Sequence, residues 1–300
     1  TQPPVVSIVI GSYNQKSILE KVLANYELQS MQDPFEVIIV DSSSSDGTGD
    51  FLTGYTPTNT NFQLRPIIQA NEGKAAARNK GVDVANSGLI IISDSDMIPD
   101  AQFVETHVEA HRNHPGKPVC YEGVTYNMTH LHWPPNIVDT YAYIQSNYAD
   151  GKRLGWYYFL TGNLSFPKTL FEEAGGFDES FQSYGWEDLD LGYRLIQKDK
   201  VSLHYLKNAK NYHYHVLTRD EEITRHYAKG KSAQRMLAKH PKLKTFLGIN
   251  PVTKLAHAWM SESGWFHRKM QLWYKGSKKR KQNIGYYMLK EFQYLKGLLG

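Results

Sequence analysis

Two carboxylates separated by one position, Asp94 and Asp96, follow directly after the apolar run of residues 89–92. A short β-branched run of this kind is typical of a buried strand, and alternate residues beyond its end can direct both carboxylates into one crevice. Carboxylate and phosphate oxygens are the ligands that hard divalent cations take in proteins. The segment therefore indicates a divalent-cation site, with a solvated acidic turn as the alternative.

A second acidic pair, Glu187 and Asp188, stands beside Trp186 at the start of the segment GWEDLDLGYRL. The apolar spacing after the pair predicts an amphipathic helix, and adjacent carboxylates next to an aromatic ring suit general-base catalysis. Acidic residues in a first helical turn also stabilise the positive end of the helix dipole. On the residues alone, both interpretations stay open.

Two histidines, His213 and His215, alternate in the segment NYHYH near a strand-like run at residues 201–206. Imidazole nitrogens at such a place can complete a metal site that carboxylates begin. A histidine is more often a packing or surface residue, and the alternation favours a metal site only slightly.

The elements that must position these residues alternate along the first hundred positions. Apolar runs predict strands at residues 5–10, 35–40, 64–68 and 89–92, and helical spacing predicts helices over 17–30 and 74–86. This alternation predicts an α/β fold with a mostly parallel sheet flanked by helices. Ligands of such sheets bind beyond the carboxyl ends of the strands, so Asp41, Asp94 and Asp96 are expected at a binding edge.

Residues 121–160 are rich in aromatic side chains, with ten in forty positions against 13% for the whole chain. Aromatic rings stack on sugars, but they also dominate buried area, so core packing is the default expectation. No motif in this segment identifies a molecule that it binds.

The composition is that of an ordinary globular protein, with 41% hydrophobic and 21% charged residues among 300 and a formal net charge of +4. It excludes disorder and collagen-like structure. The single Cys120 cannot form an internal disulfide, and no apolar run approaches the roughly 18 residues that span a bilayer. No signal peptide is recognisable, although the sequence begins at Thr1 rather than Met. We expect a cytoplasmic protein, with peripheral attachment to the inner face of the membrane as an option.

The net charge divides unevenly, with −10 over residues 1–225 and +14 over residues 226–300. The second region reads as helices with basic faces, including the cluster Lys278–Lys281. A helical stripe follows it at Met288, Phe292, Leu295 and Leu299. Such a region packs against the rest of the chain or a second subunit, or lies on an anionic membrane surface. No recognised motif supports nucleic-acid binding.

Seven segments, in their order along the chain, resemble the motifs of family 2 glycosyltransferases of the GT-A fold. They are VSIVIGSYNQ, VIIVDSSSSDGT, NEGKAAARNKG, IIISDSDMIPD, TGNLSFPKTLFEEAGGFDESF, GWEDLDLGYRL and NAKNYHYH, and together they span about residues 5–216. The form of GWEDLDLGYRL is most similar to the chondroitin-polymerase-like and galactosyltransferase-like branches.

The resemblance implies a GT-A catalytic domain over residues 1–225. Its nucleotide-binding half covers about residues 1–100, and its acceptor-binding half about 101–225. The basic helical region, residues 226–300, lies outside the resemblance.

The resemblance also implies which residues contact the nucleotide sugar. They are Gly11, Ser12 and Tyr13 at the base wall, Asp41 at the base, Gly73 and Arg78 at the ribose and diphosphate, Asp94 and Ser95 in the Asp-x-Asp segment, Gly162 and Asn163 at the donor-sugar and acceptor pocket, and Trp186. Two positions depart from the usual family pattern: Gly11 stands where Pro or Thr is commoner, and Lys74 where Gly or Leu is.

For the metal, Mn²⁺ or Mg²⁺, the resemblance implies Asp96 and a histidine. The strand-like run 201–206 is followed by one loop residue, Lys207, and His213 comes six residues after Lys207. The family's metal-ligand histidine stands at a comparable place, so the resemblance favours His213 over His215. The same resemblance makes Asp188 the catalytic base, with Glu187 as the other member of the pair.

The activity so implied is a metal-dependent, inverting transfer of a hexose or N-acetylhexosamine from a nucleotide sugar, expected to be a UDP-sugar. The acceptor is a saccharide or lipid-linked hydroxyl, as in the biosynthesis of bacterial cell-surface polysaccharides. The alternative is a non-catalytic carbohydrate- or nucleotide-binding module on the same fold. A Rossmann oxidoreductase is disfavoured because the position after the first strand holds only Gly11 instead of G-x-G-x-x-G.

Overall fold

The computed structural model describes residues 2–131, 133–135, 140–142, 147–182, 184–198, 201–215, 217–259 and 264–300. The chain divides into two compact units. The α/β unit comprises Thr1–Glu179 and Glu187–His215, and the helical unit comprises Ser180–Trp186 and Val216–Gly300. The division at 215–216 comes earlier than the expected boundary at 225, because one continuous helix runs through residue 225 and packs within the helical unit.

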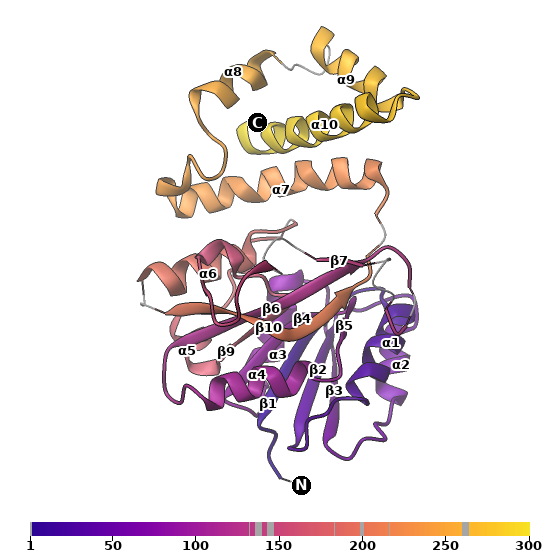
Figure 1. The fold of residues 1–300 in the computed structure, drawn as a ribbon, viewed down its shortest axis with the longest axis vertical. Coiled ribbons are helices and arrows are strands. Elements are labelled where there is room, and N and C mark those ends of the chain that lie inside the picture. Colours follow the sequence, from indigo (N-terminus) through magenta and orange to yellow (C-terminus); the bar gives the residue numbers. More distant parts are fainter. Residues whose placement is uncertain are drawn as a thin grey trace. The chain divides into compact units, whose positions relative to one another are not determined.

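The α/β unit is built on a sheet whose described strands number ten, in the order β3-β2-β1-β4-β9-β6-β10-β5, with β7 beside β6 and β8 beside β10 (Figure 1). The strands are β1 Val6–Ser12, β2 Phe35–Asp41, β3 Phe62–Ile68, β4 Leu89–Asp94, β5 Met97–Pro99, β6 Val119–Met128, β7 Thr140–Ala142, β8 Arg153–Leu154, β9 Asn163–Pro167 and β10 Ser202–His213. The first four pair in parallel, and β6 pairs in parallel with β10. The short strands β5, β7, β8 and β9 run antiparallel to their neighbours. The predicted α/β fold is confirmed, since the long described strands all share one direction.

Helices cover both faces of this sheet. They are α1 Lys16–Tyr26, α2 Thr48–Gly54, α3 Lys74–Asp83, α4 Phe103–Arg112, α5 Lys168–Glu173 and α6 Glu187–Lys198, with a 3-10 turn η3 at Trp156–Tyr158. A hydrophobic core lies on each face of the sheet. Alternate residues of β1 point into different cores, because successive side chains of a strand lie on opposite faces. Ile8 and Ile10 pack with α1 and α4, whereas Val9 packs with α3 and α6.

Helix α1 is shorter than the predicted helix over 17–30. It ends at Tyr26, and the side-chain amide of Gln29 donates to the carbonyls of Asn25 and Asp100. A carbonyl of the last turn is thus satisfied by a side chain rather than by further helix.

The aromatic-rich segment mostly supplies core, as expected. Phe159 is fully buried and Tyr121 nearly so, while Tyr157 is 47% exposed. The rings of Tyr126, Tyr148 and Tyr158 pack against the core of the α/β unit. The side chains of Tyr141 and Tyr143 lie outside the described part of the chain.

The helical unit consists of α7 Arg219–Lys239, η4 Pro241–Leu243, α8 Pro251–Trp259, α9 Trp265–Lys275 and α10 Lys279–Leu299. Helix α7 begins with a capping box in which Thr218 and Glu221 satisfy each other's backbone N–H groups. Helices α7 and α10 pack side by side (Figure 1). Their backbones meet at two glycines: a Cβ on Gly230 would lie 2.1 Å from the carbonyl oxygen of Tyr294, and one on Gly297 would lie 2.2 Å from that of Tyr227.

The predicted apolar stripe of α10 packs inside this unit. Phe292 and Leu295 are buried together, with Met288 and Leu299 against them. Among the described helices, none combines the length and the apolarity needed to cross a membrane.

Candidate active site

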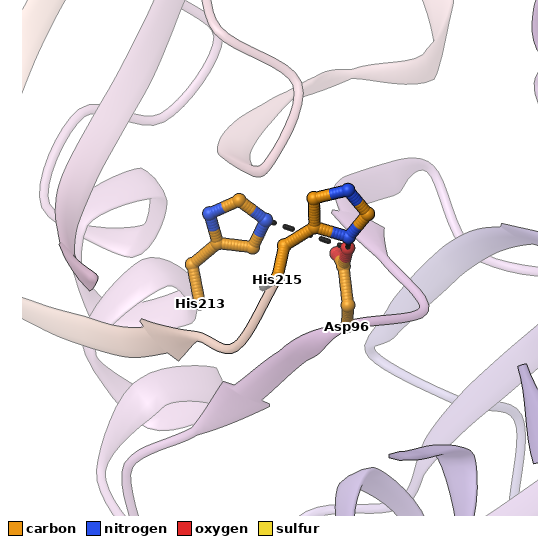
Figure 2. A group of neighbouring side chains, drawn as sticks. All are labelled: Asp96, His213 and His215. Atoms are coloured by element: carbon orange, nitrogen blue, oxygen red, sulfur yellow. Dashed lines mark ion pairs between the residues drawn. The ribbon is translucent and has the colours of Figure 1, made fainter. Parts of the chain in front are cut away.

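Three side chains that could hold a metal ion converge at one edge of the sheet: Asp96, His213 and His215 (Figure 2). Strand β5 pairs with the last residues of β10, opposing Met97 to His213 and thereby bringing Asp96 beside both imidazoles. The Oδ2 atom of Asp96 lies 3.4 Å from Nε2 of His213 and 3.2 Å from Nδ1 of His215. The structure therefore brings both histidines to Asp96 and does not prefer His213.

The donor atoms of this group fit a divalent cation. The Nδ1 atom of His213 lies 3.0 Å from the carboxamide oxygen of Asn127, and the tautomer protonated at Nδ1 donates to that oxygen. The lone pair of His213 Nε2 then faces the carboxylate of Asp96, an arrangement that a cation would stabilise. The Nε2 atom of His215 is buried with no partner in the described residues. A carboxylate and two imidazoles together form a donor set that Mn²⁺ accepts readily.

A β-bulge directs the end of β10 toward this site. The pairing of β10 with β6 shifts register between Leu206 and Lys210, so three residues of β10 lie outside the ladder. The strand-like run at 201–206 does not end in a loop, as the sequence suggested, but continues through the bulge to His213. The extra residues re-aim the following side chains, which is the usual effect of a bulge next to a functional site.

Asn163 holds that bulge from inside the sheet. Its side-chain amide donates to the carbonyl of Ala209 at 2.9 Å and to that of Val124 at 3.2 Å. Its carboxamide oxygen lies 2.9 Å from Nε2 of His107, a fully buried residue of α4. Asn163 is itself fully buried, so the structure places it behind the site and not, as the sequence suggested, on the wall of a sugar pocket.

A buried arginine joins the strand end to α6. Arg78 is 1% exposed and makes ion pairs with Asp94 at 2.7 Å and with Glu187 at 3.0 Å. The ammonium of Lys74, at the first position of α3, also reaches Asp94 at 3.0 Å. Although burial opposes ionisation, the positive charges of Lys74 and Arg78 hold the pKa of Asp94 below its usual range. Lys74, which the sequence marked only as a departure from the family pattern, is thus part of the cluster.

Asp188 titrates near neutrality. Partial burial, and then the negative charge of Glu187, raise its pKa to about 7, while Arg78 acts in the opposite direction. A carboxylate with this pKa can accept a proton at physiological pH. Glu187 is instead committed to its ion pair with Arg78, so it positions the start of α6.

Glu122 is a further acidic residue that the sequence analysis missed. It lies in β6, is almost fully buried and accepts a hydrogen bond from the backbone N–H of Leu160. Burial raises its pKa well above the ordinary value, and the charge of Asp188 adds to the shift. The available signal was a single glutamate inside an otherwise apolar strand, VCYEGV.

Hydrogen bonds tie the loops after β1 and β2 together. The backbone N–H of Asn14 donates to Ser44, and the side chain of Asn14 accepts from the N–H of Ser45. Asp41 is buried and accepts from the N–H of Ser44. Tyr13, in the loop after β1, is 51% exposed, and the buried hydroxyl of Ser12 has no partner among the described residues.

Four other predicted residues lie beside Asp94 or against helix α3. A Cβ on Gly162 would be 4.0 Å from the Asp94 carboxylate and 2.7 Å from the terminal methyl of Met97. Ser95 follows Asp94 directly and is buried. Gly73 has φ of +95° immediately before α3, a backbone conformation that favours glycine, and so starts the helix that carries Arg78. Gly11 packs against α3, where its Cβ would meet Ala77 at 3.5 Å.

Trp186 directly precedes Glu187 in the sequence. It belongs to the helical unit, where it is buried and its indole N–H donates to the carbonyl of Lys229 at 3.0 Å. A left-handed backbone at Gly185 and Trp186, with φ of +84° and +78°, precedes the start of α6. That this indole contacts the nucleotide sugar stays a prediction.

Comparison with known proteins identifies related chains. Residues 7–175 match the family model described as Glycosyl transferase family 2, and residues 144–218 match the one described as N-terminal domain of galactosyltransferase. The chain is 29% identical over 219 residues to validoxylamine A glucosyltransferase of Streptomyces hygroscopicus subsp. jinggangensis, an alignment covering 64% of this chain and 51% of that protein. It is 27% identical over 224 residues to chondroitin synthase of Pasteurella multocida, covering 64% of this chain and 23% of that protein.

These curated relatives are longer than the present chain, which spans about half of the first and a quarter of the second. Among solved structures, S. aureus TarS 1-349 in complex with UDP superposes with a TM-score of 0.56 at 14% identity, covering 97% of this chain and 89% of that one. The superposition supports the predicted GT-A fold. The predicted likeness to chondroitin-polymerase-like and galactosyltransferase-like proteins is confirmed by the matches.

Proposed function

The chain belongs to glycosyl transferase family 2, and from this premise we propose that it moves a hexose or N-acetylhexosamine from a UDP-sugar to an acceptor hydroxyl, with a divalent metal and with inversion. The observation that carries the proposal is the convergence of Asp96, His213 and His215 at the sheet edge next to Asp94. Nucleotide-sugar transfer needs positive charge at the diphosphate and a base at the acceptor, and this edge supplies candidates for both.

Positive charge at the diphosphate is the first requirement, because negative charge develops on that leaving group as the glycosidic bond breaks. A bound Mn²⁺ or Mg²⁺ would offset part of this charge. Among the chain's own residues, the half-exposed ammonium of Lys74 stands at the N-terminus of α3, where free backbone N–H groups favour anions. Arg78 is held by Asp94 and Glu187, so it fixes the cluster in place.

Asp188 meets the second requirement. As general base, its carboxylate would take the proton of the acceptor hydroxyl while that oxygen attacks the anomeric carbon from the face opposite the diphosphate. One displacement of this kind inverts the configuration and needs no covalent intermediate on the protein. The Arg78–Glu187 ion pair fixes the first turn of α6 and so holds Asp188 in position.

The choice of donor and acceptor rests on similarity. TarS superposes on this chain both as its complex with UDP and as its complex with UDP-GlcNAc, which supports a uridine-diphosphate donor here. Relatives named chondroitin synthase support a saccharide acceptor, as in the synthesis of a bacterial surface polysaccharide. A lipid-linked saccharide offers the same acceptor hydroxyl.

A donor-hydrolysis screen tests the proposal. The full chain is incubated with a panel of UDP-hexoses and UDP-N-acetylhexosamines, with Mn²⁺ or with EDTA, and released UDP is measured. We expect release from at least one donor with Mn²⁺ only, and a loss of about 10²–10⁴-fold in Asp188→Asn, because a general base contributes about that much. Asp83→Asn, which removes an exposed carboxylate, is the matched control.

Binding without release distinguishes the alternative function. If the chain binds UDP-sugars but neither hydrolyses nor transfers any of them, the non-catalytic binding module is the better account. Metal-independent release would instead remove the metal from the proposal.

A further inference from the structure

Helix α9 carries large apolar side chains on two faces. On the face toward α10, Met270 is buried, and a Cβ on Gly285 would lie 2.7 Å from the carbonyl oxygen of Met270, so the two backbones touch. On another face, Trp265 and Leu272 are each 72% exposed. Their spacing of two helical turns places them on the same side. The face of α9 that carries Trp265 and Leu272 is therefore open to a second partner besides α10.

Cationic side chains surround the exposed pair. Arg268 and Lys275 follow Trp265 and Leu272 by three positions each, which puts them on the same side of α9, and both are exposed. The cluster Lys278–Lys281, between α9 and the start of α10, is exposed as well. Residues 264–281 contain seven basic residues and no acidic one.

Lys281 of the basic cluster contacts a ring of α9, as does Lys269 of α9 itself. The ammonium groups of Lys269 and Lys281 lie 5.3 Å and 5.7 Å from the ring centre of Trp273. The basic cluster and the exposed face of α9 therefore form one surface, which we call the α9 surface, made of Trp265, Arg268, Leu272, Lys275 and Lys278–Lys281.

We propose that the α9 surface docks on a lipid bilayer that contains anionic lipids. Tryptophan and leucine among lysines and arginines are the composition of helices that lie in a membrane interface, where the apolar groups enter the headgroup region and the cations meet lipid phosphates. A soluble polyanion would pair with the cations but leave Trp265 and Leu272 in water. A second copy of the chain would bring another +14 region against this one.

This docking goes beyond the proposed transfer reaction and does not depend on it. It would hold the chain on a membrane surface by a side-on contact, since none of the described helices can cross the bilayer.

Vesicle flotation with the full chain tests the docking. One set of vesicles is phosphatidylcholine alone, and the other contains about 30 mol% phosphatidylglycerol, which gives a negative surface. We expect flotation only with the anionic vesicles and weaker binding as NaCl is raised. The double variant Trp265→Ser, Leu272→Ser should partition at least about tenfold less, because burial of these side chains in the interface is lost. Neutralising Lys278–Lys281 to alanine should reduce partition by at least the same factor.

Matched controls separate the α9 surface from general stickiness. Leu28→Ser removes another exposed leucine, and alanine at the exposed Lys21, Lys80, Lys117 and Lys207 removes four charges elsewhere. Both controls should float like the unchanged chain.

Three outcomes would overturn the docking. The first is no flotation of the intact chain with anionic vesicles. The second is equal flotation of the double variant and its Leu28→Ser control. The third is evidence for another partner. Either the intact chain is a dimer and the double variant a monomer, or the intact chain binds heparin but not vesicles.

Discussion

At the residue scale, the raised pKa of Asp188 predicts how the reaction depends on pH. A base acts in its deprotonated form, and partial burial with the charge of Glu187 sets this pKa at about 7. We therefore expect kcat/KM to rise about tenfold per pH unit below that value and to level off above it. Initial rates with a fixed Mn²⁺ concentration across the neutral range measure the profile. A rate that stays constant through the pKa would remove Asp188 as the base.

The same carboxyl group makes a prediction about stability that needs no substrate. Its folded pKa of about 7 lies above the unfolded value of 3.8, so the folded state loses stability from this group as pH rises between the two values. Asp188→Asn should therefore raise the melting temperature above neutral pH and leave it unchanged in acid below the unfolded value. Equal melting-temperature shifts at both ends of the range would contradict the burial of this charge.

The two histidines predict a metal site with three protein ligands. His213→Ala and His215→Ala should each weaken Mn²⁺ binding by at least about tenfold, since even loss of an outer partner of a metal ligand costs that much. Electron paramagnetic resonance of free Mn²⁺ measures the affinity without any turnover, and His130→Ala, at an exposed position, is the control. An effect of His213→Ala alone would restore the two-residue site that the sequence suggested.

The positions of Asp94 and Asp96 could be predicted from the sequence, whereas the surroundings of Asn163 and Trp186 could not. Asp94 and Asp96 follow an apolar strand, so their place at the sheet edge follows from topology. Asn163 supports a bulge in a strand distant in the sequence, and no local pattern shows that pairing. Trp186 belongs to the helical unit, where its indole N–H donates to the carbonyl of Lys229, and motif order cannot show that contact.

At the scale of elements, two glycines that flank the site predict different outcomes. A Cβ on Gly123 would lie 2.1 Å from the side-chain oxygen of Asn163 and 2.4 Å from the backbone oxygen of Ala209, neither of which can move without disturbing the bulge. A Cβ on Gly162 would be crowded only by the flexible end of Met97, at 2.7 Å. Gly123→Ala should cost about 3 kcal/mol or more, whereas Gly162→Ala should cost less than about 1.5 kcal/mol. Denaturant unfolding of both variants measures the difference. Equal costs would show that the bulge tolerates movement.

Elements differed in how well the sequence predicted them. Strands β1, β2 and β4 are buried on both faces, so each appears as a continuous apolar run with clear limits. The strand predicted at residues 201–206 ends earlier than β10 does, because Lys207 and Asn208 interrupt the apolar pattern at the bulge. Strands β5, β7 and β8 span three residues or fewer and exist through their partners, so no periodicity marks them.

At the scale of the whole molecule, the net charge of +4 combines an acidic α/β unit with a strongly basic helical region. Each unit buries its own apolar residues: the two cores around the sheet draw on the α/β unit, and the α10 stripe packs within the helical unit. Separate cores allow separate unfolding transitions.

The close contact of α7 and α10 tests this separation. Even a Cβ atom at position 297 would lie 2.2 Å from the backbone of α7. The larger side chain of Gly297→Leu should therefore push the two helices apart and lower the melting temperature of the helical unit. The proposed binding of UDP by the α/β unit should persist. Circular dichroism follows melting and isothermal calorimetry follows UDP binding, with Gly54→Ala, which has open space around its Cβ, as the control. Loss of UDP binding in the correctly folded α/β unit would show that the units depend on each other.

The central claim, metal-dependent transfer with Asp188 as base, is tested most directly by measuring UDP-sugar binding and turnover together in the unchanged chain, Asp96→Ala and Asp188→Asn. We predict that Asp96→Ala or EDTA weakens binding and abolishes turnover, whereas Asp188→Asn binds the donor normally and loses about 10²–10⁴-fold in turnover. Full turnover by Asp188→Asn, or donor binding that is the same with Mn²⁺ and with EDTA, would contradict the account.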